Sequence, residues 1–149
     1  ASLQSKATHA SRHAEQCCQI LTELLCQLIS GKPLPSALEQ TRKRQMNNEI
    51  SEMMRRNIVE ESEDDIQSGG YAIDTLHAAL WSTLTTDSFE RAVLRACNLG
   101  DDADTTAAVA GQIAGAMYGY SNIPQDFKVG LKDERKLYVT SQLLHQWVE

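Results

Sequence analysis

The chain has 149 residues, of which 23% are charged, and its formal net charge is -6 at pH 7. That length suits one domain with a hydrophobic core of its own. The acidic balance disfavours binding to duplex nucleic acid, because phosphate contacts require clustered lysine and arginine. No apolar run is long enough to cross a bilayer. We therefore expect neither a nucleic-acid partner nor a membrane partner.

The four cysteines show no C-x-x-C spacing, and a chain of this size does not resemble a small disulfide-stapled protein. We expect them to be reduced, buried thiols that pack as small hydrophobes, which suits a cytoplasmic protein. The sequence begins Ala1-Ser2-Leu3, without methionine. We expect a processed chain, an excised piece or a fragment of a longer protein.

Apolar residues recur at helical spacing along nearly the whole chain, and no strand-like alternation is present. The fold class predicted is therefore all-α. In chain order, the predicted helices cover residues 9–30, 36–44, 46–59, 71–84, 88–97, 103–118 and 134–148. The broad apolar face of residues 9–30 predicts a central position for that helix.

Turn and capping residues separate these helices. Gly31 offers a left-handed stop, Pro35 suits the start of the next helix, and Gly69-Gly70 follows an acidic loop. Asp87-x-x-Glu90 resembles a capping box, and Asp133 suits the N-cap of the last helix. Trp81 and Trp147 have leucine neighbours at helical spacing, so we expect both in the core.

Three aspartates, Asp101, Asp102 and Asp104, lie within four positions, between a helix that ends and a helix that begins. Carboxylates near a helix N-terminus are favoured by about 0.3–1 kcal/mol each, so capping explains one of them and at most two. A divalent cation is the simplest remedy for the remaining repulsion. Oxygen ligands, including a threonine hydroxyl, select hard ions such as Mg²⁺, Mn²⁺ or Ca²⁺.

Two known motifs fail on this loop. An EF-hand that began at Asp102 needs glycine and glutamate where Ala107 and Ile113 stand. The D-x-D-x-T pattern of haloacid-dehalogenase phosphatases is matched literally, but it must follow a buried strand, and residues 89–97 have the pattern of an amphipathic helix.

The helix after this loop has small residues every four positions, namely Ala107, Gly111, Gly115 and Gly119. Small residues on one face let helix backbones approach closely, whereas each internal glycine costs roughly 0.5–1 kcal/mol relative to alanine. We therefore expect this helix to be squeezed at the centre of a bundle, where it holds the aspartate loop rigidly.

Residues 71–124 carry a specific resemblance. The stretch 68–81, SGGYAIDTLHAALW, is followed by SFE at 88–90, NLG at 98–100, DADTT at 102–106 and Ile-Pro at 123–124. This order resembles the C-terminal signature of the ADP-ribosylglycohydrolase family. The resemblance implies a compact orthogonal helical bundle with a two-metal centre, usually of Mg²⁺ or Mn²⁺.

The family motif places metal ligands at Asp102, Asp104 and Thr105, and Asp102 and Asp104 then also serve catalysis. The implied activity is hydrolysis of the bond at the anomeric carbon of ADP-ribose, in an ADP-ribosylated protein or a related small molecule. One departure is Asp101, where the family usually has a second glycine.

A larger departure is that the family's upstream Asp-Asp-Thr motif has no counterpart here. We therefore expect residues 1–149 to be the C-terminal part of a single domain, inactive without the N-terminal half. The parent protein is then the enzyme. The alternative is a non-catalytic helical binding or structural module of the same fold.

The resemblance also suggests substrate-binding residues. Thr8-His9 resembles a family pair near bound ADP-ribose, and Gly70-Tyr71 resembles a loop that reaches the substrate. His9 as a ligand contact and His9 as an ordinary cap or core residue both remain open. The same holds for Tyr71 as a substrate contact or a core residue.

Overall fold

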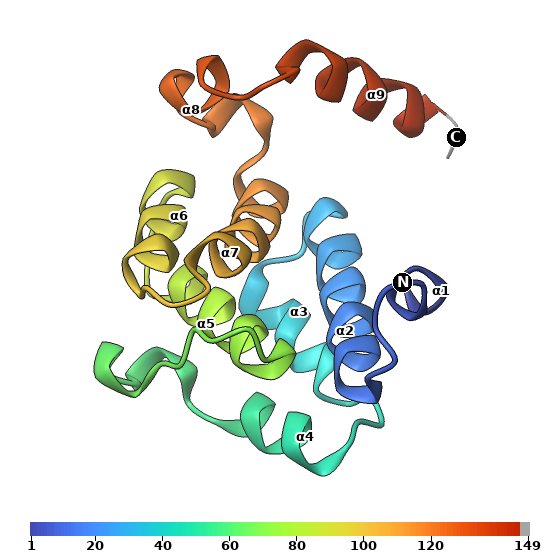
Figure 1. The fold of residues 1–149 in the computed structure, drawn as a ribbon, viewed down its shortest axis with the longest axis vertical. Coiled ribbons are helices and arrows are strands. Elements are labelled where there is room, and N and C mark those ends of the chain that lie inside the picture. Colours follow the sequence, from blue (N-terminus) through green and yellow to red (C-terminus); the bar gives the residue numbers. More distant parts are fainter. Residues whose placement is uncertain (147–149) are drawn as a thin grey trace.

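The computed structural model describes residues 1–146, and this part of the chain is helical without a strand, as predicted. The α-helices are α1 (Ser2–Lys6), α2 (Arg12–Ile29), α3 (Leu34–Thr41), α4 (Asn48–Arg55), α5 (Ala72–Leu84), α6 (Phe89–Asn98), α7 (Ala103–Tyr118), α8 (Gln125–Val129) and α9 (Glu134–Gln146). Short 3-10 turns lie at η1 (Ile58–Glu60), η2 (Glu63–Asp65) and η3 (Tyr120–Asn122). Figure 1 shows α2 to α7 gathered in one bundle.

The central helix of this bundle is α5, not the helix predicted from residues 9–30. Ten of the thirteen residues of α5 are buried, and the helix packs against α2, α4, α6 and α7. Trp81 of α5 is 1% exposed, as predicted, and its Nε1 donates to the Glu61 carbonyl at 3.0 Å. In contrast, α2 buries one side only, and Ile29 at its end is 75% exposed.

Helix boundaries differ from the predicted ones where side-chain caps decide them. The Ser11 hydroxyl accepts the Ala14 amide, so α2 begins at Arg12 and His9 lies before it. Ser88, rather than Asp87, caps α6 by accepting the Arg91 amide at 3.3 Å. The predicted helix 46–59 is α4 and then η1.

The remaining differences concern short elements and the chain end. The helix α3 begins at Leu34, so Pro35 sits within its first turn. The five-residue helices α1 and α8 were not predicted from spacing. The predicted end of the last helix at residue 148, and Trp147, lie outside the described residues.

The small-residue face of α7 lies against α6. A methyl group built on Gly111 would meet Val93 at 3.7 Å, and one on Gly115 would meet Phe89 at 3.9 Å, which are ordinary contact distances. These two glycines are half-buried, whereas Ala110, Ile113 and Ala114 are fully buried. The expectation of a helix squeezed at the centre was therefore wrong for this face, although α7 does pack against α2, α5 and α6.

The four cysteines are free thiols, as expected, but only Cys17 is buried. Cys18 is half-buried, and Cys26 and Cys97 are exposed. The expectation of four buried thiols was therefore wrong, because Cys26 and Cys97 fall on the outer faces of α2 and α6.

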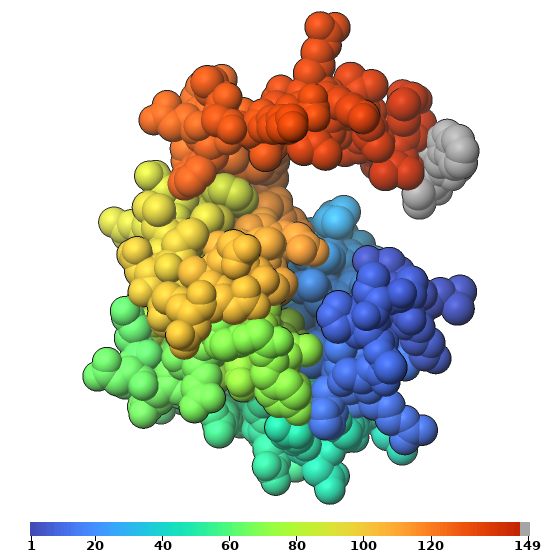
Figure 2. Space-filling view, in the orientation of Figure 1, coloured from blue at the N-terminus to red at the C-terminus, as the bar shows by residue number. Residues whose placement is uncertain are grey.

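The helices α8 and α9 form a C-terminal arm, residues 125–146. Phe127 of α8 lies edge to face with Phe89 of α6, with ring centroids 6.1 Å apart, whereas α9 extends away from the bundle. Figures 1 and 2 show open space between this arm and the C-terminal end of α2. None of the thirteen residues of α9, all of which the structure describes, is buried. Across residues 1–146, no helix combines the length and apolar character that a membrane span requires.

Candidate functional site

Two loops that are far apart in the sequence lie side by side at the N-terminal ends of α5 and α7. Ser68 joins them: its hydroxyl donates to the Gly100 carbonyl at 3.1 Å, and its carbonyl accepts the Asp102 amide at 3.1 Å. Ser68 is 2% exposed, so these hydrogen bonds are shielded from water. The glycine loop (residues 68–71) therefore holds the aspartate loop (residues 100–105, which include the first turn of α7) in place.

Asp102 occupies the N-cap position of α7, but its carboxylate accepts no amide of that helix. Its Oδ1 accepts the Thr105 hydroxyl at 2.8 Å instead. Capping therefore does not account for this carboxylate, which keeps Oδ2 free of partners in the described residues. Oδ2 faces Gly70, where an added Cβ would lie 3.3 Å from it, so a side chain at position 70 would press on the carboxylate.

Asp101 and Asp104 flank Asp102 in the sequence, and both are exposed to solvent. Asp101 has a left-handed backbone with φ 48°, directly after Gly100 with φ 80°, and its side chain is exposed. Asp104 lies in the first turn of α7 and is also exposed. Within residues 1–146, no three His, Cys, Asp or Glu side chains converge closely enough to hold a metal ion.

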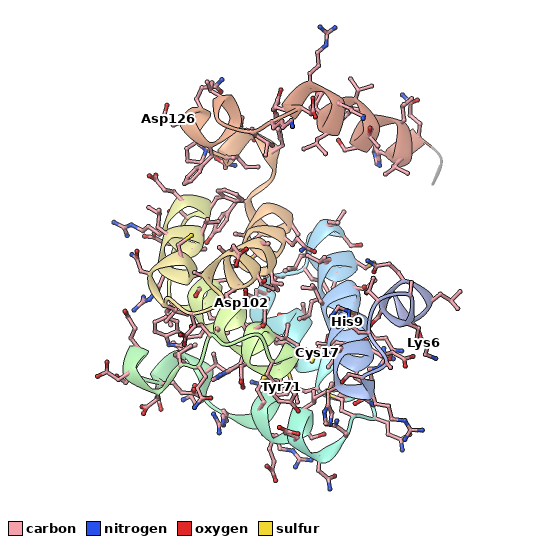
Figure 3. The ribbon with its side chains drawn as sticks, viewed as in Figure 1. Lys6, His9, Cys17, Tyr71, Asp102 and Asp126 are labelled. Carbon is pink, nitrogen blue, oxygen red and sulfur yellow. The ribbon has the colours of Figure 1, made fainter. Side chains whose placement is uncertain are left out.

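A cavity of about 410 Å³ opens next to these loops, between α1, α2, α5 and α7. His9, Gly70, Tyr71 and Thr105 all line it, so one hollow collects the three predicted substrate contacts and one predicted metal ligand. The aspartates Asp102 and Asp104 are not among the lining residues. Figure 3 shows His9, Cys17 and Tyr71 in this part of the molecule, and Asp126 far away on the C-terminal arm.

The walls of the cavity combine apolar and polar groups. Its inner side includes Cys17, Leu76 and Val109, and its rim carries Thr8 and His9, whose Oγ1 and Nδ1 lie 2.9 Å apart. Burial raises the pKa of the Cys17 thiol to about 12, so this sulfur stays protonated and is no nucleophile at neutral pH.

Tyr71 is the N-cap residue of α5, and its hydroxyl points to neighbours outside the cavity. The hydroxyl oxygen lies 2.9 Å from Nδ1 of His13, and it donates to the Glu49 carboxylate at 3.2 and 3.3 Å. Loss of solvent around the ring, and next the Glu49 carboxylate, raise the pKa of the Tyr71 hydroxyl. Tyr71 is 41% exposed, so the reading of it as a core residue was wrong.

The family model for ADP-ribosylglycohydrolase matches residues 1–149, that is, the whole chain. The chain belongs to the ADP-ribosylglycohydrolase family. The resemblance seen in the sequence, and the all-helical fold expected from it, are confirmed.

Several members of the family are similar to this chain. The ADP-ribosylarginine hydrolase Tri1 of Serratia proteamaculans is 40% identical over 141 residues, which cover 90% of this chain and 36% of that protein. The ADP-ribosyl-[dinitrogen reductase] glycohydrolase of Rhodospirillum rubrum is 31% identical over 136 residues, which cover 90% of this chain and 44% of that protein.

A solved structure agrees with these sequence matches. A chain described as part of an ADP-ribosylglycohydrolase-related protein complex matches with a TM-score of 0.80 and 34% identity, over 89% of this chain and 46% of that chain. The present chain thus spans less than half the length of these relatives.

For this member of the family, sequence reasoning found the aspartate loop but missed what holds it. Ser68 belongs to the motif at 68–81, but nothing in that motif predicts the hydrogen bonds that Ser68 makes with the aspartate loop. Thr106 is the last residue of the motif at 102–106, and its Oγ1 is fully buried without a hydrogen-bond partner in the described residues, which the motif does not predict. The contacts of Glu49 and His13 with Tyr71 join three segments that the sequence alone does not bring together.

The donor atoms at the aspartate loop fit a hard divalent cation. They are all oxygens, from the carboxylates of Asp102 and Asp104 and the hydroxyl of Thr105, and the Asp102 carboxylate is not used up by capping. They form only part of a coordination shell, because residues 1–146 contain no group of three acid, histidine or cysteine side chains that could hold a metal ion.

Proposed function

We propose that this chain is the C-terminal part of a metal-dependent hydrolase that cleaves the glycosidic bond at the anomeric carbon of ADP-ribose. The substrate class is an ADP-ribosylated protein or a related small molecule. The observation that carries the proposal is the Asp102 carboxylate, free of capping, next to a cavity lined by His9, Gly70 and Tyr71. Relatives named as ADP-ribosylarginine hydrolase and glycohydrolase support the same reaction class.

In this proposal Asp102, Asp104 and Thr105 bind two Mg²⁺ or Mn²⁺ ions together with ligands from elsewhere in the protein. Such a pair of ions supplies a water that is nucleophilic near neutral pH and a positive charge against the ribose oxygens. The Thr105 hydroxyl fixes one oxygen of Asp102 by hydrogen bonding and leaves the other free to bind. The hydrogen bonds of Ser68 keep the loop from shifting when charge accumulates there.

The cavity residues bind and orient the sugar nucleotide. Gly70 places no side chain between the cavity and the Asp102 carboxylate, where a Cβ would lie close to Oδ2. Tyr71 offers an aromatic wall and His9 a polar group at the rim. Holding the anomeric carbon of the substrate beside the aspartate loop lowers the barrier to hydrolysis, because the reacting groups are already in position.

We further propose that an upstream segment of the same protein completes the metal site and that this chain is inactive without it. Two observations support this: the incomplete ligand set of residues 1–146, and the small share of each relative that the chain covers. The free thiols also suit the cytoplasmic location that we propose for the whole protein.

The test is hydrolysis of ADP-ribosylated arginine and serine peptides by the full-length protein with Mg²⁺, together with Mg²⁺ binding by calorimetry. Asp102→Ala and Asp104→Ala should each lower kcat/KM by about 10²-fold or more, since metal assistance contributes several kcal/mol and each 1.4 kcal/mol is tenfold. Both should weaken Mg²⁺ binding. Asp126→Ala, an exposed aspartate on the C-terminal arm, is the matched control and should change neither.

Three results would argue against the proposal. Full activity in the presence of a chelator would show that hydrolysis does not need a metal ion. Full activity of Asp102→Ala would show that the Asp102 carboxylate is not needed for hydrolysis. Binding of ADP-ribose by an intact protein that hydrolyses neither peptide would favour the non-catalytic binding module instead.

A further inference from the structure

The hydroxyl of Tyr71 is held by two side chains that do not line the cavity. Glu49 comes from α4 and His13 from α2, and the chain positions are 22 and 58 residues away from Tyr71. The imidazole ring of His13 meets the Tyr71 ring edge to face, with centroids 5.9 Å apart. His13 Nε2 also lies 3.7 Å from a Glu49 carboxylate oxygen, so the three groups form a closed cluster.

Hydrogen-bonding chemistry assigns the direction of each contact. An ionised carboxylate has no proton to donate, so Tyr71 gives its single hydroxyl proton to Glu49. The Tyr71 oxygen then accepts from Nδ1–H of His13, which is 2.9 Å away. Both partners are satisfied by one orientation of the tyrosine, and rotation of the ring about its side-chain bonds would break both contacts.

These contacts are not needed to hold α4 on the bundle. The helix α4 buries Ile50, Met53 and Met54, which are at most 5% exposed. The side chains of Glu49 and His13 are 55% and 37% exposed, and hydrogen bonds between such exposed groups contribute little to folding. Their consequence lies instead at Tyr71, which lines the cavity and is 41% exposed.

We propose that Glu49 and His13 are positioning residues for the substrate: they fix the Tyr71 hydroxyl from outside and so keep its ring as a ready wall of the cavity. The inference rests on the proposed function, because it takes the ADP-ribose group as the occupant. A free tyrosine would have to be ordered when the ligand binds, which costs affinity, whereas an anchored one is ordered beforehand. The effect is on binding rather than on the chemical step.

The experiment is a double-mutant cycle on the affinity of the full-length protein for ADP-ribose, measured by calorimetry. Glu49→Ala should weaken binding by about 3- to 10-fold, as expected for one side chain that loses its preorganisation. Tyr71→Phe keeps the ring but removes the anchored hydroxyl, and it should weaken binding to a similar extent. In the Tyr71→Phe background, Glu49→Ala should then add nothing.

Controls separate anchoring from folding and from nearby charge. Glu52→Ala removes an exposed glutamate from the same helix and should leave the affinity unchanged. Glu49→Gln keeps a hydrogen-bond acceptor and should recover most of the affinity. Melting temperatures of all variants should stay close to that of the unmodified protein.

The outcomes are distinct. If Glu49→Ala leaves the affinity unchanged, or weakens it equally in the Tyr71→Phe background, the positioning role is overturned while the proposed function stands. If the unmodified protein does not bind ADP-ribose, the proposed function falls and this inference falls with it.

Discussion

The helices α5 and α9 have the same length, thirteen residues, and both carry apolar residues at helical spacing, yet they have opposite surroundings. In α5 ten residues are buried, whereas in α9 none is, and Leu137, Leu143 and Leu144 are each more than half exposed. An apolar period therefore indicates that a segment is helical, but not that its apolar face is covered by this part of the protein. The candidate site belongs to the packed part of the molecule, because its loops precede α5 and α7, and both of these helices pack within the bundle.

The largest difference in stability is expected between matched leucine variants, one in α5 and one in α9. Leu80 of α5 is 0% exposed and Leu144 of α9 is 61% exposed. Leu80→Ala should lower the free energy of unfolding by about 2–5 kcal/mol, through lost burial and a cavity that closes only in part. Leu144→Ala should change it by less than about 0.5 kcal/mol.

Urea denaturation followed by circular dichroism measures both leucine variants under one condition. A cost for Leu144→Ala that approaches the cost for Leu80→Ala would mean that the arm is covered in solution. The distinction between the two helices would then disappear.

A second, smaller contrast concerns two histidines. His77 of α5 is 5% exposed, with Nε2 3.0 Å from the carboxylate of Glu61, while His145 lies on the exposed helix α9. Burial lowers the pKa of His77 below its ordinary value of 6.5, against the opposing effect of the Glu61 charge; Arg56 lowers it further and Asp74 raises it.

The sign of the pH effect follows from proton uptake. Below about pH 6.5 the unfolded chain protonates this histidine and the folded chain resists it, so stability falls as pH falls, by at most about 1.4 kcal/mol per pH unit. His77→Gln should flatten this slope in denaturation series between pH 7.5 and 5.5, and His145→Gln should not. Stability that rises towards pH 5.5 would show that the Glu61 ion pair outweighs burial.

The sequence predicted those features that depend on local pattern. The long helices followed from apolar spacing, the aspartate loop from the charge density of Asp101, Asp102 and Asp104, and the family from an ordered set of short motifs. The helix α1 was missed because five residues carry too little periodicity. The start of α6 was placed one residue early because Asp87 and Ser88 are both good caps, and only the backbone decides between them.

Features that depend on contacts between distant segments were not predictable. Nothing near Ser68 in the sequence says that its hydroxyl will reach the Gly100 carbonyl. Nothing near Tyr71 points to Glu49, because the pairing results from how α4 packs on α5. The loops of the site could thus be found from the sequence, whereas the groups that hold the loops and the tyrosine required the fold.

The smallest change in stability is expected for two aspartates that have left-handed backbones. Asp101 has φ 48° and lies before α7, and Asp133 has φ 60° and lies before α9. Aspartate tolerates this conformation, glycine adopts it freely, and alanine is strained by roughly 1 kcal/mol. Asp101→Ala should therefore lower the free energy of unfolding by about 1 kcal/mol, and Asp101→Gly should restore most of it, because this loop is bonded to Ser68 inside the bundle. Asp133→Ala should reduce helical circular dichroism from the arm without moving the urea midpoint, since α9 buries no residue whose loss the bundle would register. Equal shifts of the midpoint for Asp101→Ala and Asp133→Ala would show that the arm unfolds together with the bundle.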